Sequence, residues 1–347
     1  MYVVRPEMHV VRPFRPADLG GIASIWHACV DEGAWEGTDH AEIERQLEQV
    51  EAEPAWTLVV DVAGAVAGSI TPRLNDVSVG VAYRRRGVGT ALVRASLDLV
   101  RAQHEPYLLL YVPGGGDPPE DTPARRFAEG CGLAYRATLT RMRLDDLSRV
   151  PEPELPAGVV LRTFDADRED AEAYVDLMNA SFEGHPTPVS WTREQVEGAH
   201  AAPGFDLDGI AFLTWSDRPT SLVGFARTRV EHDDAGRRFG EVALIGVLPE
   251  WRGLGLGRAL LRWSIGRFRA LELREAELLV VATNDRALAL YRAEGFRTVV
   301  AWPQWSLDAQ DPGRAADAVV VFGGAGPGQE LPSWRPADPR AGGAGPT

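Results

Sequence analysis

The stretch GEVALIGVLPEWRGLGLGRALLRWSIGRFRALELREAELLVVATNDRALALYRAEGF, residues 240–296, decides the fold of this chain. Residues 241–247 are apolar and rich in branched side chains, which predicts a buried strand closed by Pro249. The glycine-rich run 252–257 follows, and apolar residues then recur at helical spacing over 259–268. A glycine-rich turn between a strand and a helix directs backbone N–H groups and the positive end of the helix dipole at an anion. The stretch therefore predicts a cradle for a pyrophosphate.

The spacing of the glycines helps to distinguish among the known kinds of phosphate-binding loop. A Walker loop needs a lysine, and this chain contains none. A dinucleotide fingerprint needs an acidic residue after the next strand, where this chain has Asn284. The pattern Val247-x-Pro249-x-x-Arg252-x-x-Gly255-x-Gly257, with Asn284 and the ending Ala287-x-x-Leu290-Tyr291-x-x-x-Gly295-Phe296, instead resembles the coenzyme A loop of the GNAT superfamily of N-acyltransferases.

The resemblance implies acetyl-CoA (coenzyme A) as cofactor. We expect it to be held by Val247, Leu248, Arg252, Gly253, Leu254, Gly255, Leu256, Gly257, Arg258, Asn284 and Ala287. Asn284 can also cap the helix that follows it.

Composition sets the outer bounds. The 347 residues are enough for two domains, and 45% hydrophobic with 25% charged residues is a globular balance. No apolar run approaches a membrane span and no signal peptide is evident, which favours a cytoplasmic protein. The net charge of −14 argues against nucleic acid and against an anionic membrane as partners. Cys29 and Cys131 are interpreted as free thiols.

The order of predicted elements occurs twice. An offset of 168 residues lays Val79 on Val247, Arg84 on Arg252, Gly87 on Gly255 and Gly89 on Gly257. The expected fold class is therefore α/β (α+β): two tandem GNAT-like domains, each a mixed, mostly antiparallel twisted sheet flanked by helices. We expect a first domain over 1–147, a linker over 148–157, a second domain over 158–310 and a Gly/Pro-rich tail over 311–347.

The two copies differ where chemistry would take place. Arg73 occupies the position of Glu241, and Ala128 occupies the position of Tyr291. The first copy keeps the anion loop, with Arg84, Gly87 and Gly89 as cofactor-binding candidates. We interpret it as a degenerate domain that holds structure or cofactor rather than as an independently active one.

Acetyl transfer to an amine needs a proton acceptor, a donor to the developing oxyanion and a proton donor for the leaving thiolate. Glu241 is the candidate base, and a bare backbone N–H near Val247 or Leu248 can face the thioester carbonyl. Tyr291 is the candidate acid, because a phenol with a pKa of about 10 stays protonated at neutral pH. Residues 179–186, which include His185, show no metal-ligand spacing, so no metal is expected.

The second half resembles one family within the superfamily. The runs 179–194, 203–208, 224–230 and 240–257 are similar to the second domain of the mycothiol synthase family of tandem GNAT enzymes, which acetylate a cysteinyl amine. The resemblance implies that Glu241 and Tyr291 are catalytic and that the first domain binds cofactor without reacting. Arg229 stands where the family has a substrate-binding lysine, and His185 is a second substrate-binding candidate. Thr187 and Leu279 depart from the family's acid and tyrosine.

The leading hypothesis is thus an acetyl-CoA-dependent N-acetyltransferase that acts on a small-molecule amine by direct attack in a ternary complex, as a monomer or homodimer. One alternative is a non-catalytic acyl-CoA-binding sensor or partner-docking protein, and another is a peptide or protein N-acetyltransferase. The Glu241, Asn284 and Tyr291 set argues against a pure binder, because binding alone does not need all three.

Overall fold

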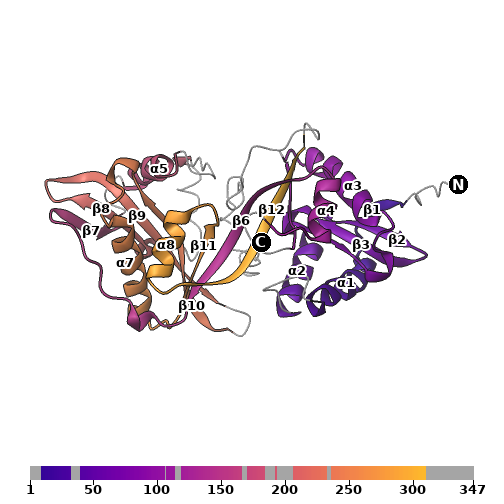
Figure 1. Ribbon diagram of the computed structural model, residues 1–347, viewed down its shortest axis with the longest axis horizontal. Coiled ribbons are helices and arrows are strands. Elements are labelled where there is room, and N and C mark those ends of the chain that lie inside the picture. Colours follow the sequence, from indigo (N-terminus) through magenta and orange to yellow (C-terminus); the bar gives the residue numbers. More distant parts are fainter. Residues whose placement is uncertain are drawn as a thin grey trace, which may run out of the picture. The chain divides into compact units, whose positions relative to one another are not determined.

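The computed structural model describes residues 9–32, 40–105, 107–113, 119–165, 170–183, 192–193, 206–232 and 236–309. These residues form two compact units (Figure 1). Residues up to 139 and residues 300–309 belong to unit 1, and residues 140–299 belong to unit 2. Both units contain β-strands paired into sheets and flanked by helices, as the sequence predicts. The four-stranded sheet of unit 1 is antiparallel, and the strands of unit 2 include a parallel pair.

Unit 1 begins with the first copy of the repeated pattern. Its elements are β1 (Val11–Pro13), α1 (Leu19–Asp31), α2 (His40–Ala52), β2 (Leu58–Val62), β3 (Ala65–Thr71), β4 (Asp76–Val79), α3 (Val88–Ala102), β5 (Tyr107–Tyr111) and α4 (Pro123–Gly130). Strands β1 to β4 follow one another antiparallel in that order. Ala63 and Gly64 turn the β2–β3 hairpin with φ of 53° and 84°, the left-handed conformation that a two-residue hairpin turn requires.

Unit 2 contains most of the second copy. Its elements are β7 (Val159–Thr163), α5 (Asp170–Ser181), β8 (Ile210–Trp215), β9 (Arg218–His232), β10 (Arg238–Val247), α7 (Leu256–Ala270), β11 (Ala276–Val281) and α8 (Asp285–Ala293). Strands β11, β10, β9, β8 and β7 are neighbours in that order. Only the β10–β11 pairing among these is parallel.

Strands β6 (Ala134–Leu144) and β12 (Arg297–Asp308) have residues in both units. The sequence analysis assigned the last strand to the second domain, whereas residues 300–309 group with unit 1. The reason is the strand partner: β12 pairs antiparallel with β5, from Gln304↔Tyr111 to Asp308↔Tyr107. Trp305 and Leu307 of β12 accordingly lie in the core of unit 1.

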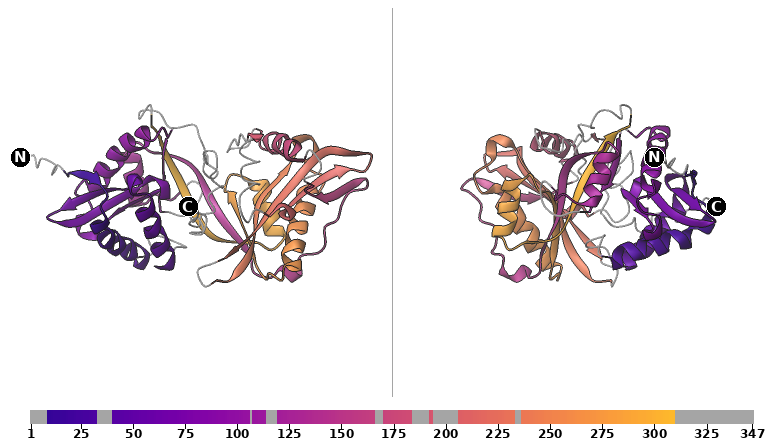
Figure 2. Two further views of the ribbon diagram at one scale, coloured as in Figure 1. Left: turned by 180° about the vertical axis from the view of Figure 1, so that it is seen from behind. Right: turned by 45° about the vertical axis from the view of Figure 1, so that its right-hand side comes forward.

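Helices cover both faces of the unit 2 sheet, which Figure 2 shows from two further directions. On one face, Phe268 of α7 packs with Val242 of β10 and Leu278 of β11. On the other face, the ring of Tyr174 of α5 meets Phe225 of β9 edge-on at 5.2 Å. Among the described residues, no helix combines the length and apolar character that a membrane crossing requires.

Candidate active site

The site is organised by a gap between two parallel strands of unit 2. The register of β10 with β11 covers three pairs, from Gly240↔Ala276 to Val242↔Leu278. Strand β10 then bulges between Val242 and Leu244 and continues to Val247 paired with β9 alone. Over residues 244–247 the edge of β10 that faces β11 therefore carries backbone groups that are outside the ladder.

The glycine-rich loop lies at the end of this strand. Gly255 has φ of 81° and is the N-cap of α7, with no side chain capping the helix. Gly253 has φ of 89°, and an added Cβ at either glycine would meet no atom within 4 Å. At Gly257 such a Cβ would approach only Leu290, at 3.8 Å. Gly253 and Gly255 are thus favoured by their left-handed backbone conformation, and packing excludes a side chain at none of the three glycines.

The first N–H groups of α7 belong to Leu256, Gly257 and Arg258, and such groups have no partner inside a helix. The first intrahelical bond runs from the N–H of Ala259 to the carbonyl of Gly255. Leu254 is 51% exposed beside them. The loop can therefore hold a diphosphate, as its sequence predicts.

Arg252 braces this loop from within. Its Nε donates to the carbonyl of Val247 at 3.1 Å, and its Nη2 donates to the carbonyl of Ser181 at 2.8 Å. These bonds tie the loop to the end of β10 and to the end of α5. Arg252 thus orders the cradle, and its contact with a pyrophosphate stays a prediction.

The sequence analysis expects one bare backbone N–H near Val247 or Leu248. The N–H of Leu248 is engaged, because it donates to the carbonyl of Val223 at 3.0 Å. Because hydrogen bonds of an antiparallel pair alternate between the two sides of a strand, the N–H of Val247 is directed away from β9 and into the gap. Val247 is the remaining candidate donor to an acyl oxygen.

Helix α8 supplies the candidate acid. Asn284 is its N-cap and accepts from the N–H of Ala287 at 3.1 Å, which confirms the predicted cap. Tyr291 packs against the cluster that contains Val242 and Phe268. Burial raises the pKa of Tyr291 to about 12, so the phenol keeps its proton at neutral pH.

Glu241 is paired with Arg229 in the structure. Arg229 Nε and Nη2 donate to Glu241 Oε2 at 3.1 and 2.7 Å, and both side chains are largely buried. Among the described residues, no hydrogen bond reaches Glu241 Oε1. The sequence analysis named Glu241 as a base and Arg229 as a substrate contact, and the structure brings the two into one ion pair. His185, the other substrate candidate, lies outside the described residues.

Two further carboxylates were missed by the sequence analysis. Glu277 is 6% exposed and is the β11 residue that pairs with Glu241 in the parallel register. Its Oε1 forms an ion pair with Nη2 of Arg143 at 2.6 Å. Glu294 accepts from Arg262 at 2.9 Å and from Arg258 at 3.0 Å. A charged residue inside the apolar run AELLVV was the available signal for Glu277.

Side chains on β10 alternate between the two faces of the sheet. Val242 faces α7 and α8, together with Tyr291, so Glu241 faces the side covered by α5. The candidate acid and base therefore lie on opposite faces of the unit 2 sheet.

A family model matches the chain twice. The model described as "Acetyltransferase (GNAT) family" matches residues 22–133 and again residues 171–296. The chain belongs to the acetyltransferase (GNAT) family. It is an acetyltransferase, and acetyl-CoA is the acetyl donor of this family.

Relatives within the GNAT family include curated proteins named mycothiol acetyltransferase. The one from Thermobispora bispora is 36% identical over 68% of this chain and 75% of its own length. The one from Frankia alni is 35% identical over 67% of this chain and 69% of its own.

Solved GNAT structures share the fold. A GCN5-related N-acetyltransferase from Sphaerobacter thermophilus has a TM-score of 0.67 at 22% identity, covering 91% of this chain and all of its own. A tandem GNAT protein from the clavulanic acid biosynthesis pathway has a TM-score of 0.55 at 19% identity, covering 87% and 98%.

The first GNAT copy in unit 1 repeats the loop. Arg84 Nε donates to the carbonyl of Val79 at 3.0 Å, and Gly87 is the N-cap of α3 with φ of 87°. Gly89 is buried, and a Cβ there would meet Phe127 at 3.0 Å. Whether Arg84, Gly87 and Gly89 contact a cofactor stays a prediction.

Proposed function

We propose that unit 2 transfers the acetyl group of acetyl-CoA to a primary amine of a small molecule, with Glu241 as proton acceptor and Tyr291 as proton donor. The observation that carries this proposal is the geometry of Glu241. Arg229 holds Oε2, and Oε1 has no hydrogen-bond partner among the described residues. A carboxylate fixed by one oxygen can present the other to an incoming amine.

The cofactor would be held by the loop and by the gap. Backbone N–H groups of residues 253–258 suit the diphosphate, because Gly253 and Gly255 leave open space where any other residue would place a Cβ. Acetyl-CoA supplies an activated acetyl group as a thioester. The N–H of Val247 is the donor available to the acyl oxygen, and Asn284 adds a side-chain amide beside α8.

The direct attack uses both faces of the sheet. An amine that enters from the α5 side reaches Glu241, which takes up its proton. Tyr291, whose pKa burial raises to about 12, provides a proton from the α8 side. A ternary complex of this kind needs no covalent intermediate on the protein.

For the acceptor we propose a small molecule with a cysteinyl or similar primary amine. Identity of 36% with a protein named mycothiol acetyltransferase supports this class. Leu279 lies on the same strand two residues after Glu277, where the resembling family has a tyrosine, so the acceptor's own contacts differ there. A panel of primary amines tests the class through loss of thioester absorbance, since a thiol-bearing acceptor interferes with thiol detection.

The substitution Glu241→Gln tests the mechanism. It keeps the shape and removes the proton acceptor, so we expect kcat to fall by about 10²-fold to 10⁴-fold. The dissociation constant of coenzyme A, measured by calorimetry, should stay within about twofold because the loop is untouched.

Glu250→Gln is the matched control, since Glu250 is an exposed carboxylate close to the same loop. It should leave both quantities unchanged. If Glu241→Gln turned over as fast as the unmodified enzyme, Glu241 would have no part in the proton transfer.

A further inference from the structure

A second buried carboxylate lies next to Glu241 on the sheet of unit 2. Glu277 of β11 is paired with Glu241 of β10, and neighbouring strands lie about 4.8 Å apart. Both side chains are on the face opposite Val242 and Leu278, which pack against α7. The pair Val242↔Leu278 is also the last one before the gap between the two strands opens. Glu241 and Glu277 therefore lie side by side at the edge of the gap.

An arginine from an outer strand fastens each of these carboxylates. Arg229 of β9 donates to Glu241 Oε2 at 3.1 and 2.7 Å. Arg143 of β6 donates from Nε to Glu277 Oε1 at 2.8 Å, and its Nη2 lies 2.6 Å from the same oxygen. Because the strand order is β6, β11, β10, β9, the charges across the sheet run plus, minus, minus, plus.

The other oxygen of each carboxylate accepts no hydrogen bond within the part of the chain that the structure describes. Arg141 Nε lies 3.8 Å from Glu277 Oε2, which is beyond hydrogen-bond distance. Glu231 shares Arg229 with Glu241, at 3.6 Å. Only 9% of the Glu277 side chain is accessible, and burying a carboxylate is costly unless its oxygens find donors. The two neighbouring carboxylates therefore have room for a further donor.

We propose that Glu277 is a second contact for the acceptor, and that Glu241 and Glu277 together bind the amine as its ammonium ion. The inference rests on the proposed function, which places the amine at Glu241. An ammonium has three N–H donors and a positive charge, so it can donate to Glu241 Oε1 and Glu277 Oε2 together. It also offsets the repulsion between two like charges on adjacent strands. Such a site selects basic aliphatic amines over alcohols and aromatic amines, which are neutral at pH 7.

The ammonium must lose a proton before its nitrogen can attack. It gives one proton to Glu241, which passes it to water, and the neutral amine attacks the thioester carbonyl. As the C–N bond forms and the C–S bond breaks, the nitrogen loses a second proton by the same route. Tyr291 protonates the leaving sulfur and regains its proton from water, while the third proton stays on the amide nitrogen. Glu277 keeps its charge throughout, so its part is binding.

The first copy lacks this pair of carboxylates. At the offset of 168 residues, Arg73 corresponds to Glu241 and Leu109 corresponds to Glu277. Leu109 is buried in unit 1. Recognition of an ammonium is accordingly a property of unit 2.

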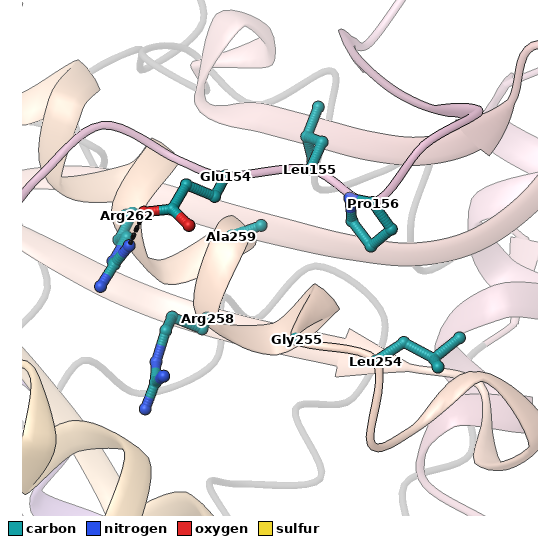
Figure 3. Close-up of a pocket in the computed structure, with 8 residues that line it drawn as sticks. All are labelled: Glu154, Leu155, Pro156, Leu254, Gly255, Arg258, Ala259 and Arg262. Carbon is teal, nitrogen blue, oxygen red and sulfur yellow. Dashed lines mark hydrogen bonds and ion pairs between the residues drawn. The ribbon is translucent and has the colours of Figure 1, made fainter.

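A rival position for a cation is the cavity of about 390 Å³ beside the glycine-rich loop (Figure 3). Of the lining residues labelled there, Glu154 alone carries a carboxylate, and Arg262 lies 3.4 Å from it. The side chain of Glu154 is 87% accessible, so water screens its charge. The buried pair on β10 and β11 is therefore the stronger site for an ammonium.

The test compares two ligands that differ in charge. S-methyl-L-cysteinamide carries a primary amine, and its 2-hydroxy counterpart has a neutral hydroxyl in place of that amine. Calorimetry on the full chain, saturated with coenzyme A, is done at about pH 6.5, where an α-amino group is protonated. We expect the ammonium compound to bind at least about tenfold more tightly than the hydroxyl compound, as charge-assisted hydrogen bonds imply.

Substitutions at Glu277 should change this ratio of affinities. Glu277→Gln keeps the shape and removes the charge, so it should lower the ratio about tenfold by weakening the ammonium compound alone. Glu277→Asp keeps the charge and should retain more of the ratio. The affinity of each variant for coenzyme A, measured first, shows that unit 2 is folded. A ratio that survives Glu277→Gln in a folded variant overturns the proposal.

Two matched controls should preserve the ratio. Asp170→Asn also breaks a buried arginine–carboxylate pair, but one that joins α5 to β7. Glu154→Gln removes the carboxylate of the cavity. A lowered ratio in Glu154→Gln would place the ammonium in the cavity, and a lowered ratio in Asp170→Asn would make the effect a general one of broken buried pairs. Either result overturns the assignment to Glu277.

Steady-state kinetics separate binding from proton transfer. Glu277→Gln should raise the KM of S-methyl-L-cysteinamide about tenfold and change kcat by less than about threefold. The reason is that the nitrogen is positively charged both in the bound ammonium and again as the C–N bond forms. A fall in kcat at constant KM would make Glu277 part of the chemistry and overturn its role as an acceptor contact.

The ammonium contact can fail while acetyl transfer remains. Equal binding of the two ligands to the unmodified chain, with S-methyl-L-cysteinamide still acetylated, has that meaning. If neither ligand binds and the amine is not acetylated, the proposed acceptor class fails and this inference fails with it. Loss of turnover in EDTA that magnesium restores would place a divalent cation between the carboxylates and overturn the ammonium.

Discussion

The two copies of the loop are built alike. In unit 1 the Nε of Arg84 lies 3.0 Å from the carbonyl of Val79, and in unit 2 the Nε of Arg252 lies 3.1 Å from that of Val247. The glycine N-caps that follow have φ of 87° and 81°. The offset of 168 residues read from the sequence therefore holds for the loop in three dimensions.

The hairpins that lead into the two loops are different. The β3–β4 ladder runs only from Gly68↔Val79 to Thr71↔Asp76, whereas the β9–β10 ladder runs from Gly224↔Val247 to His232↔Arg238. Arg73, which the offset aligns with Glu241, lies in the turn Pro72–Leu74 and has its guanidinium over Trp56. The first copy thus lacks the arm of the hairpin that carries Arg229 and Glu241.

The glycine-rich loop that can hold a diphosphate is therefore structurally separable from the residues proposed for proton transfer. The cradle needs only glycines of the right conformation and a bracing arginine, which both copies have. The proton transfer that we propose uses the longer hairpin and the tyrosine of α8, and the first copy has Arg73 and Ala128 at the corresponding positions.

The largest effect in this set is expected from Tyr291→Phe, which gives unit 2 the same loss as Ala128 in unit 1. Without a proton donor, kcat should fall by about 10²-fold. Burial raises the pKa of Tyr291 to about 12, so the unmodified phenol stays protonated and the loss should be equal at pH 7 and pH 9.

Tyr107→Phe is the control for this change. Tyr107 lies in unit 1, and burial also raises its pKa to about 12. Its hydroxyl has no part in the proposed chemistry, so turnover should not change. An equal loss in both variants would mean that removing a buried hydroxyl damages the fold, not the reaction.

Alanine substitutions at the two equivalent glycines, Gly255 and Gly87, should distinguish the contributions of the two loops to coenzyme A binding and turnover. A side chain at a left-handed φ costs roughly 1–2 kcal/mol, so Gly255→Ala should weaken coenzyme A by about tenfold. Gly87→Ala imposes the same strain on unit 1 and should leave turnover unchanged. Calorimetry and steady-state kinetics on both variants check this, and a loss of turnover in Gly87→Ala would make the first loop part of the reaction.

An effect of similar size should come from Arg229→Gln, a substitution that tests whether this arginine holds Glu241 or binds the acceptor. If it holds the carboxylate, kcat should fall by about tenfold while the KM of the amine stays constant. The same change in a Glu241→Gln background should then have little further effect, because the pair is already broken. A raised KM with unchanged kcat would instead make Arg229 a substrate contact.

The sequence predicted the cradle because its information is local. Glycines, a bracing arginine and the Asn284 cap lie within a few residues of the groups they serve. The Arg229–Glu241 pair could not be read in the same way, because its register depends on hairpin length and on the bulge between Val242 and Leu244. The partner of β12 was also hidden, since residues 300–308 would extend a sheet of either unit equally well by their apolar pattern.

A final feature common to both units is a buried arginine–aspartate pair near the start of each. Arg12 binds both oxygens of Asp18 at 2.7 Å, and Arg162 binds those of Asp170 at 2.6 and 2.7 Å. Both aspartates are buried. Removing Asp18 leaves Arg12 with only the longer contact to Asp61, whose Oδ2 lies 3.4 Å from Nη2. Asp18→Ala should therefore reduce the free energy of unfolding by about 3 kcal/mol at pH 7, the lower end of the range for a broken buried pair.

The dependence of this effect on pH follows from the pKa of Asp18. The hydrogen bond from Arg12 holds that pKa below 3.8, so the folded state keeps the carboxylate charged when the unfolded chain has already bound a proton. The stabilisation is therefore complete above the unfolded pKa and disappears as the pH falls through the folded one. Urea unfolding should show the difference between Asp18→Ala and the unmodified chain shrinking as the pH is lowered below about 4.

Asp121→Asn is the matched control in the same unit. Arg126 donates two hydrogen bonds of 2.8 Å to the two carboxylate oxygens of Asp121, in the same bidentate geometry but on the surface. Water and salt screen that pair, so its removal should not measurably change unfolding. If both substitutions changed the free energy of unfolding equally, burial would not explain the stabilisation by the Arg12–Asp18 pair. The same would then hold for the Arg162–Asp170 pair of unit 2.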